Sequence, residues 1–310
     1  MKYKQNSISS THRLWLAAGA CVLIVCLLLA SGCASARQHP RFTVAPKEWN
    51  LPVKPFQIVG NVYYVGASGI SSYLVVSPDG LILLNCGTTE TTRQVLANIK
   101  QLGFDPGKVK ILIGLHGHYD HVGGAGLIKQ ATGAKLFVGA DDRELVENGG
   151  RNDAQFGDAF VFPPVAVDRK LQDGEKIQLG AVELFIHTTP GHTPGTITCT
   201  MTMGAGNRRY HIVFAGSVTC PGYTLVGNPR YPEVADDFSG TFKTLNSLPC
   251  DVFLTEHGWD CDLANKIKRL DHAGPNPFID PAGYHQLLAN SEARFDELRR
   301  KQSAEPQVTQ

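Results

Sequence analysis

The sequence predicts an α/β protein in which two mixed β-sheets pack face to face and helices cover their outer faces, an αββα sandwich. Short apolar runs of strand length alternate with segments of helical periodicity, in the order strands, helix, strand, helix, and this order occurs twice along the 310 residues. A hydrophobic content of 43% and a charged content of 18% fit a globular domain with a sizeable core. We place a single domain at residues 37–302 and expect a disordered tail at residues 303–310.

The first half of the domain follows a proline-rich segment, residues 38–55, that we expect to be extended. Apolar residues at helical spacing from Val95 to Leu102 predict a helix over residues 89–102, which ends at Gly103. Shorter helices are expected at residues 125–131 and 141–146. Strands are predicted at residues 57–59, 62–65, 72–76, 81–85, 111–115 and 135–138.

The second half begins after residues 147–164, which are rich in Gly, Asn and Pro and are expected to form a long loop beside the functional site. Helices are predicted at residues 238–248 and 281–301. Strands are predicted at residues 176–179, 182–186, 196–202, 210–214 and 252–254.

Residues 1–36 have the pattern of an export signal. Lys2, Lys4 and Arg13 precede an apolar run at residues 15–30, which is short for a membrane span. Two processing sites compete, because Ala30-Ser-Gly-Cys33 resembles a lipobox and residues 34–36 suit ordinary cleavage after Ala36. Both predict a periplasmic protein, and the first would anchor it to the outer membrane through a lipid on Cys33.

Export would place the remaining cysteines in an oxidising compartment, where disulfides form. Five cysteines lie beyond the signal, so at most two disulfides and one free thiol are expected, with the pairing left open. No C-x-x-C spacing occurs, so a cysteine-rich structural zinc site is not indicated. The five are Cys86, Cys199, Cys220, Cys250 and Cys261.

The most informative stretch is Leu-His-Gly-His-Tyr-Asp-His-Val-Gly-Gly at residues 115–124. Its imidazoles and carboxylate, on His116, His118, Asp120 and His121, are ligands that zinc prefers. Alternation in an extended chain sends His116 and His118 to one side, and a tight turn can bring the other two toward them. Chance clustering of surface histidines is the alternative, but three of the eleven histidines fall within six residues beside an acid. The stretch therefore predicts a metal site.

Three later segments add polar groups after strands or in fixed loops. His192 lies in Thr-Pro-Gly-His-Thr-Pro-Gly, His257 follows the strand at 252–254, and Ser217 and Thr219 follow the strand at 210–214. Taken alone, His192 or His257 would be interpreted as a structural residue with no metal-binding role. With the first stretch they give more ligands than one tetrahedral structural zinc can use, which favours two metals with open positions.

Together these segments resemble the metallo-β-lactamase superfamily and, within it, the class B enzymes of subclass 3. The pattern His-x-His-x-Asp-His carries the superfamily match. Segments at residues 77–80, 132–135, 191–195, 221–223, 227–232, 249–251 and 276–278 carry the finer one. The resemblance covers residue 57 to the closing helix and implies the αββα metallo-β-lactamase fold.

The resemblance implies roles for individual residues. His116, His118 and His192 would hold a first zinc, and Asp120, His121 and His257 a second. Ser217 and Thr219 would bind a substrate carboxylate, and Gln155 and Tyr223 would contribute further substrate contacts. Two positions depart from the pattern: Asn85 stands where Asp is common in the superfamily, which leaves one hydrogen bond open, and Thr219 is Thr where Ser also occurs. Ser217 discriminates among relatives, because many hydrolases of the superfamily carry a bridging Asp there and the other two lactamase subclasses a zinc-binding Cys.

The function implied is hydrolysis of the β-lactam amide of penicillins, cephalosporins and carbapenems by a zinc-bound hydroxide that Asp120 orients, conferring antibiotic resistance. The protein would hold two Zn²⁺ per chain and act as a monomer on this small-molecule substrate. Other hydrolases of the fold, acting on thioesters, lactones or phosphodiesters, and a non-catalytic periplasmic zinc-binding protein are the alternatives. A net charge of +1 with no basic patch excludes a nucleic-acid partner.

Overall fold

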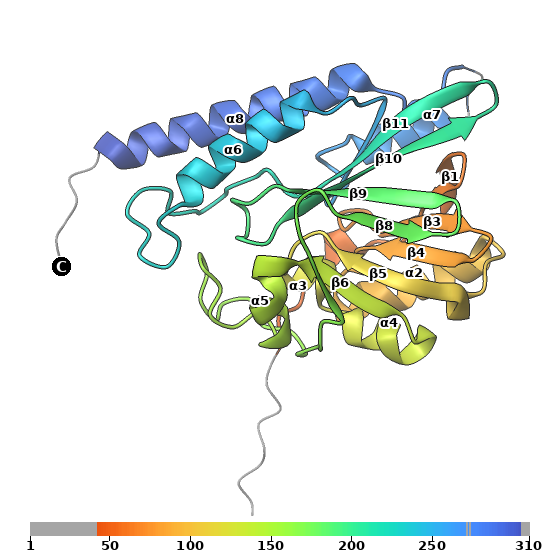
Figure 1. Ribbon diagram of the computed structural model, residues 1–310, viewed down its shortest axis with the longest axis horizontal. Coiled ribbons are helices and arrows are strands. Elements are labelled where there is room, and N and C mark those ends of the chain that lie inside the picture. The colour runs from red at the N-terminus through yellow and green to blue at the C-terminus, as the bar shows by residue number, and fades with distance from the viewer. Residues whose placement is uncertain (1–41, 271, 273, 305–310) are drawn as a thin grey trace, which may run out of the picture. The chain divides into compact units, whose positions relative to one another are not determined.

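Two sheets with helices on both outer faces make up the part of the chain that the structure, a computed structural model, describes, which is residues 42–270, 272 and 274–304. Figure 1 shows the four layers, with α6 and α8 beside one sheet and α2 and α4 beside the other. The expected αββα sandwich is confirmed. The export signal, with Cys33, lies outside the described residues and stays a prediction.

The first sheet has seven strands in the order β1-β2-β3-β4-β5-β6-β7, antiparallel from β1 to β4 and parallel from β4 to β7. Its last strand was not predicted, because only one of its three residues is buried and no apolar run marks it. The strands are β1 (Phe56–Val59), β2 (Val62–Tyr64), β3 (Tyr73–Ser77), β4 (Gly80–Leu84), β5 (Val109–Gly114), β6 (Lys135–Gly139) and β7 (Arg169–Leu171).

The second sheet has five strands in the order β12-β11-β10-β9-β8, and β11 and β12 are its one parallel pair. Both sheets are therefore mixed, as expected. The strands are β8 (Lys176–Leu179), β9 (Val182–Thr188), β10 (Ile197–Ala205), β11 (Arg208–Ala215) and β12 (Val252–Thr255).

The helices differ from the sequence-based prediction at several places. Helix α6 begins four residues before the predicted residue 238. Helix α8 continues to Ala304, so the tail that was expected to be disordered from residue 303 is helical in its first two residues. Residues 305–310 lie outside the described part of the chain. Helix α7 was missed, since Leu263 and Lys266 are the only residues that it buries. The α-helices are α2 (Thr89–Gln101), α3 (Tyr119–Val122), α4 (Ala125–Thr132), α5 (Arg143–Glu147), α6 (Val234–Ser247), α7 (Leu263–Leu270) and α8 (Pro281–Ala304).

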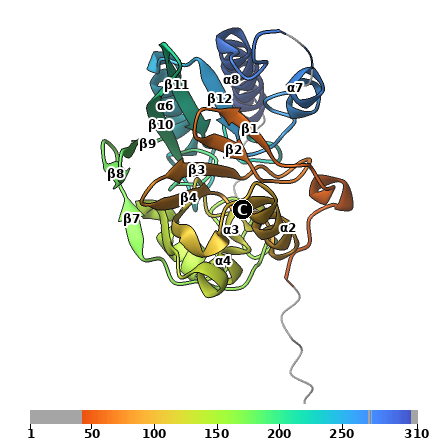
Figure 2. The same ribbon diagram turned by 90° about the vertical axis from the view of Figure 1, so that its right-hand side faces the viewer.

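Three short 3-10 helices complete the secondary structure of the described residues. Two of them, η1 (Lys47–Asn50) and η2 (Pro106–Lys108), precede β1 and β5, and the third, η3 (Ala140–Asp142), leads into α5. Helix η1 lies within residues 38–55, a segment that was expected to be extended throughout. Figure 2 shows the same layers turned by 90°. No helix in the described residues combines the length and the apolar character that crossing a membrane requires.

Strand β4 explains why the central strands read as continuous apolar runs. All five of its residues are buried. Ile82 and Leu84 belong to the core between the two sheets, whereas Leu81 and Leu83 belong to the core under α2 and α4. Successive side chains of a strand point to opposite faces, so a strand covered on both faces needs apolar residues at every position.

The expected disulfides are absent from the described residues, where all five cysteines are free thiols. Disulfide formation proceeds through a thiolate. Burial opposes that form, because it raises the pKa of the Cys86 and Cys250 thiols to about 12 and that of Cys220 to about 11. Cys86 also lies in a different core from Cys199 and Cys220.

A close backbone approach joins the end of β6 to the loop between β9 and β10. A Cβ atom at Gly139 would lie 1.9 Å from the carbonyl oxygen of Gly195. We expect Gly139→Ala to lower the free energy of unfolding by about 1–3 kcal/mol, because backbone would have to move. Urea denaturation followed by circular dichroism measures it.

The matched control is Gly126→Ala. This glycine is exposed in α4, and an added Cβ would meet no atom within 4 Å. Alanine should raise helix stability there by about 0.5–1 kcal/mol. Equal effects of the two substitutions would contradict the close approach at Gly139.

Candidate metal centre

The predicted ligands gather where strands of both sheets end. His116, Ser217 and His257 each stand two residues beyond the last residue of β5, β11 and β12. Strands β11 and β12 are parallel and paired through Ala215 and Thr255, so their ends share an edge. His192 lies in the turn between β9 and β10. The sheets meet here, because Ile197 N–H donates to the Leu115 carbonyl, 2.8 Å away.

The first motif changes conformation halfway along. His118 is extended, with φ −80° and ψ 157°, and α3 begins at the next residue. The His118 carbonyl then accepts hydrogen bonds from the N–H groups of His121 and Val122, at 3.1 and 3.0 Å. This single helical turn folds Asp120 and His121 back beside the extended pair, as the sequence predicted.

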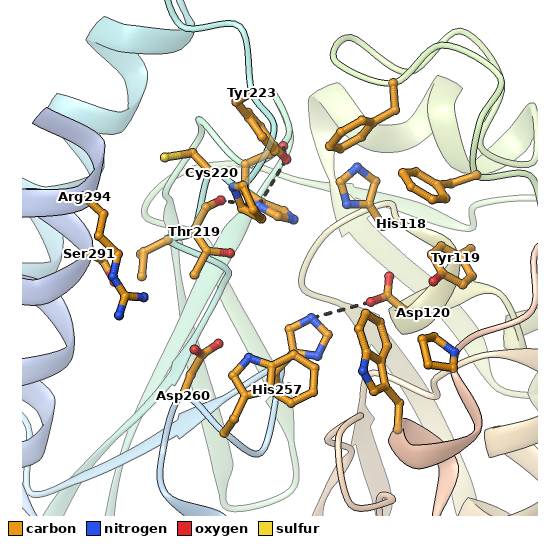
Figure 3. Close-up of a pocket in the computed structure, with 18 of the residues that line it drawn as sticks. His118, Tyr119, Asp120, Thr219, Cys220, Tyr223, His257, Asp260, Ser291 and Arg294 are labelled. Atoms are coloured by element: carbon orange, nitrogen blue, oxygen red, sulfur yellow. Dashed lines mark hydrogen bonds and ion pairs between the residues drawn. The ribbon is translucent and has the colours of Figure 1, made fainter. Parts of the chain in front are cut away.

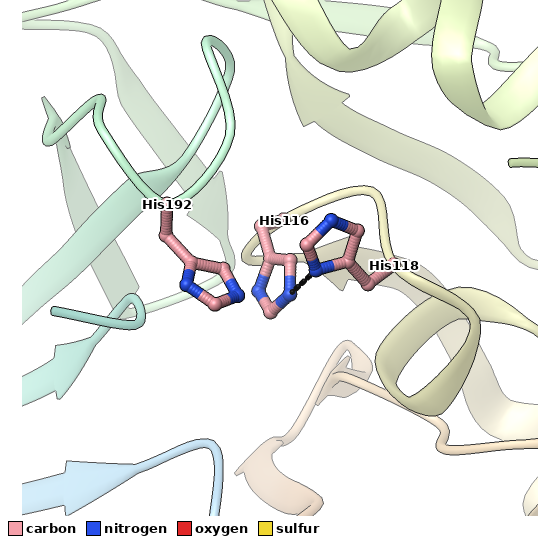
Figure 4. A group of neighbouring side chains, drawn as sticks. All are labelled: His116, His118 and His192. Carbon is pink, nitrogen blue, oxygen red and sulfur yellow. Dashed lines mark hydrogen bonds between the residues drawn. The ribbon is translucent and has the colours of Figure 1, made fainter. Parts of the chain in front are cut away.

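Three imidazoles form the first cluster. Each of His116, His118 and His192 offers a ring nitrogen within 4.8 Å of the others. Figure 4 shows the three rings converging, with Nε2 of His116 3.0 Å from Nδ1 of His118. Two nitrogens bound to one tetrahedral zinc at about 2.05 Å would be about 3.3 Å apart, so the spacing is close to that of metal ligands.

The opposite nitrogen of each ring faces a hydrogen-bond acceptor. Nδ1 of His116 lies 2.7 Å from Glu256 and Nε2 of His118 lies 3.1 Å from Asp153, both from carboxylate oxygens. Nδ1 of His192 lies 2.7 Å from the Thr219 carbonyl. When a cation binds, hydrogens on those sides would leave the converging nitrogens to present their lone pairs to it. The residues therefore fit a divalent metal.

The second cluster combines Asp120, His121 and His257. Oδ2 of Asp120 lies 3.4 Å from Nε2 of His121 and 3.5 Å from Nε2 of His257. Nδ1 of His257 donates to the Gly69 carbonyl, 3.0 Å away, which leaves its Nε2 free. Both ring nitrogens of His121 are buried without a hydrogen-bond partner among the described residues, as is expected of a side chain that awaits a ligand.

Burial and neighbouring charges set the protonation of the ligands. Burial lowers the pKa of His116 and His192 well below its ordinary value, and that of His257 to a lesser degree. Burial also raises the pKa of Asp120, but the nearby imidazoles, His121 first, outweigh it and hold that pKa well below its usual range. At neutral pH these three histidines are uncharged and Asp120 is ionised, the forms that bind a metal.

A buried carboxylate connects the two loops that carry the first cluster. Oδ2 of Asp142 accepts hydrogen bonds from the Gly117 N–H and the Thr193 hydroxyl, both at 2.6 Å, and Oδ1 accepts one from the Gly195 N–H at 2.9 Å. Burial raises its pKa to about 6. Asp142 thus joins the His116-His118 segment to the loop of His192.

A cavity of about 820 Å³ opens above the clusters. Figure 3 shows His118, Asp120 and His257 at its floor, with Arg294 and Ser291 of α8 on one side. Aromatic rings form much of its wall: Phe156 lies 5.1 Å from Phe160 and 5.3 Å from Tyr223, between ring centroids. Trp259 stacks on His257 at 4.2 Å. The cavity suits an organic molecule with large apolar groups.

Of the four residues predicted to contact the substrate, two line the cavity and two do not. Thr219 lines the cavity, whereas Ser217 does not and is hydrogen-bonded to Thr219, with 3.1 Å between the hydroxyl oxygens. Gln155 is also outside the cavity, since its side chain pairs with the backbone of Thr224. Tyr223 lines the cavity, but its hydroxyl donates to the His192 carbonyl at 2.6 Å, so it supports a ligand.

Several residues of the site were not predicted from the sequence. Glu256, Asp153 and Asp142 hold the loops and rings of the ligands, and Arg294 is the only Lys or Arg lining the cavity within the described part of the chain. Glu256 could have been suspected, because it directly precedes a ligand. The others are single residues without a motif.

The sequence model of the metallo-β-lactamase superfamily matches residues 65–257, well over half of the chain. The chain belongs to this superfamily of metallo-hydrolases. The match spans every ligand from His116 to His257, and the resemblance inferred from the motifs is confirmed.

Solved structures of the superfamily resemble the chain over most of its length. The metallo-β-lactamase FEZ-1 from Legionella gormanii is 39% identical with a TM-score of 0.81, covering 83% of this chain and 99% of that one. BJP-1 from Bradyrhizobium japonicum, a subclass B3 metallo-β-lactamase, is 35% identical with a TM-score of 0.80, covering 84% and 99%.

Curated relatives match a shorter part. A hydroxyacylglutathione hydrolase from Rhodospirillum rubrum is 29% identical over 136 residues, which are 41% of this chain and 45% of that protein. A probable metallo-hydrolase from Burkholderia pseudomallei matches over 37% of its length. The chain therefore spans less than half the length of these two relatives.

Metal binding should release a proton from His121. Burial alone would lower the pKa of this histidine, but the Asp120 and Glu256 carboxylates raise it to about 9. The metal-free side chain is therefore protonated at pH 7, and a zinc ion that binds its nitrogen must displace that proton. The proton released from His121 should disappear from the count as the pH rises through about 9, because the metal-free side chain then loses it before zinc binds.

Calorimetric zinc titrations in two buffers of different ionisation enthalpy count the released protons. His121→Ala should release about one proton fewer than the wild type at pH 7, and His211→Ala, on an exposed part of β11, should release the same number. An unchanged count for His121→Ala would mean that this side chain is not a ligand.

Proposed function

We propose that the protein hydrolyses the amide bond of β-lactam antibiotics, with one zinc ion held by His116, His118 and His192 and a second held by Asp120, His121 and His257. The observation that carries the proposal is the position of the two ligand clusters side by side on the floor of a large cavity. The similarity to metallo-β-lactamases over nearly their whole length supports the choice of substrate.

Bound zinc would supply Lewis acidity and would lower the pKa of a coordinated water to about 7, so that a nucleophile exists at neutral pH. The protein's own part is to hold the ligands in place and in the right protonation state. Asp120 lines the cavity and is ionised, so it can accept a hydrogen bond from the attacking water and orient it toward the substrate. We assign Asp120 this catalytic role in addition to its role as a ligand.

The carboxylate of a β-lactam would be bound on the side of the cavity formed by α8. Thr219 supplies a hydroxyl there, and its neighbour Ser217 orients that hydroxyl through their hydrogen bond. Arg294 faces the same space, and no ion pair within the described residues holds its guanidinium (Figure 3). An arginine and a hydroxyl on one wall suit a carboxylate.

The aromatic side of the cavity would receive the acyl side chain. Phe156, Phe160 and Tyr223 form a continuous apolar wall next to His118. Penicillins, cephalosporins and carbapenems share the strained amide and the carboxylate but differ in these side chains, and we propose that all three classes are accepted. Periplasmic export, inferred from residues 1–36, would place the enzyme where these antibiotics act and would make it a resistance factor.

Thioester hydrolysis is the second candidate, because a hydroxyacylglutathione hydrolase is among the relatives. Ser217 argues against it, since many hydrolases of the superfamily carry a bridging Asp there, and export would separate the enzyme from a cytosolic thioester. A panel of nitrocefin, imipenem, lactoylglutathione and an acyl lactone, tested side by side on the mature chain, decides between these substrates. Turnover of the thioester alone would replace our proposal.

Metal removal should abolish β-lactam turnover. After dialysis against a chelator, nitrocefin and imipenem should remain intact, and added zinc should restore hydrolysis, because the sequence holds neither Gly-x-Ser-x-Gly nor Ser-x-x-Lys, the motifs of serine hydrolysis. Elemental analysis should find two zinc ions per restored chain. Hydrolysis that survives complete metal removal would exclude the mechanism.

Arg294→Ala should raise KM for nitrocefin about tenfold with little change in kcat, because a hydrogen bond to a charged group is lost in both substrate and transition state. Arg294→Lys should recover part of the loss. Arg299→Ala, at an exposed position of α8 outside the cavity, is the control and should behave as wild type. An unchanged KM for Arg294→Ala would place the carboxylate elsewhere.

A further inference from the structure

Glu256 is a buried carboxylate that contacts a ligand of each cluster without belonging to either set. The residue is 2% exposed and directly follows β12, next to His257. Oε2 is 2.7 Å from Nδ1 of His116, and Oε1 is 3.9 Å from Nδ1 of His121. A carboxyl group in such a place needs hydrogen-bond partners that compensate for its lost hydration.

The partners of Glu256 can be assigned from their own hydrogen bonds. Oδ1 of Asn85 accepts the Leu115 N–H at 2.9 Å, so the amide nitrogen of Asn85 must face Glu256, and it donates to Oε1 at 2.9 Å. The Ser217 N–H donates to Oε2 at 2.7 Å. Both partners of Glu256 are hydrogen-bond donors, and neither can rotate so as to present an acceptor instead.

This arrangement also determines the state of His116. With the Asn85 and Ser217 donors at its two oxygens, Glu256 presents Oε2 as an acceptor 2.7 Å from Nδ1 of His116, which places the hydrogen of that ring on Nδ1. The Nε2 lone pair of His116 is left pointing at His118 and His192. Because Glu256 already accepts three hydrogen bonds, its contact with His116 and His121 is better explained as support than as a metal site of its own.

We propose that Glu256 and Asn85 act together as the positioning unit of the metal centre: the Glu256 carboxylate, oriented by the Asn85 amide, fixes the tautomer and the direction of His116 and thereby sets the zinc affinity of the three-histidine site. The inference rests on the zinc-binding part of the proposed function and is independent of the substrate. Neither residue contacts the cavity, so neither is a catalytic residue.

Single substitutions should break the unit. In Glu256→Gln the new NH₂ group must face either the Asn85 amide or the donors at Oε2, so two donors meet and one is left without an acceptor. In Asn85→Asp two carboxylates would meet where the distance is now 2.9 Å. We expect the zinc affinity of the three-histidine site to fall about 10- to 100-fold in each case.

Exchanging the two groups should restore the unit. In the double variant Asn85→Asp, Glu256→Gln, the carboxylate at position 85 accepts both the Leu115 N–H and the new amide, and the Gln oxygen accepts the Ser217 and His116 hydrogens. The backbone permits the exchange, because position 85 has φ 56° and Asp tolerates this left-handed region as Asn does. The double variant should therefore bind zinc more tightly than either single variant.

The test is a zinc titration of the metal-free mature chain in competition with a chromophoric chelator. It covers the wild type, both single variants, the double variant and the control Glu297→Gln, which changes an exposed carboxylate of α8 and should match the wild type. Thermal unfolding of each metal-free protein is recorded in parallel. No substrate is present, so a failure to hydrolyse β-lactams, which would overturn the proposed substrate, does not affect the result.

Weaker zinc binding by both single variants with recovery in the double variant is the expected result. Wild-type affinity in Glu256→Gln would overturn the inference, and so would a double variant no better than the single ones. If Glu256→Gln does not fold, a folded, zinc-binding double variant supports the unit and an unfolded one refutes it. A wild-type chain that binds no zinc would overturn this inference together with the proposed metal site.

Discussion

The metal centre depends on one constraint, which is that hydrogen-bond acceptors outside the clusters hold the rings of His116, His118 and His192 with one nitrogen of each turned toward the others. The acceptors are Glu256, Asp153 and the Thr219 carbonyl, each beside the outer nitrogen of its ring. On the inner side, Nε2 of His116 and Nδ1 of His118 are 3.0 Å apart, within hydrogen-bond distance of each other. Burial adds to the effect by disfavouring the charged forms of His116 and His192. The orientation of the rings thus favours the binding of a small cation between them.

The fold supplies the rigidity that this constraint requires. Ligands stand just beyond the ends of β5 and β12, and the turn that carries His192 is joined to the first motif through Asp142 and through the Ile197 to Leu115 hydrogen bond. The strands anchor the residues just before His116 and His257, and hydrogen bonds hold the loop of His192 against the first motif, so the distances between ligands depend on the sheets and on these bonds. The only helical ligand segment, α3, is one turn long and is bonded back to His118.

The sandwich and all six proposed ligands could be predicted from the sequence, because apolar periodicity and a dense histidine motif are local signals. What could not be predicted depends on contacts between distant segments. Asp153 reaches His118 across 35 positions and Glu256 reaches His116 across 140, and a single acidic residue carries no sign of such a partner. The open question at Asn85 was resolved in the same way, since its partner is Glu256. Gln155 lies outside the cavity because its side chain pairs with the Thr224 backbone, a contact that loop composition does not reveal. The expected disulfides are absent from the described residues, and spacing does not show which thiols meet.

Asp142 has a consequence for how the ion is acquired. By tying the Gly117 and Gly195 backbone together, it holds the His116-His118 segment and the loop of His192 in place through hydrogen bonds within the protein. A cation that binds between these histidines would therefore cost little conformational entropy. The order of the two loops would come from protein contacts, so that folding and capture of the ion would be separate events.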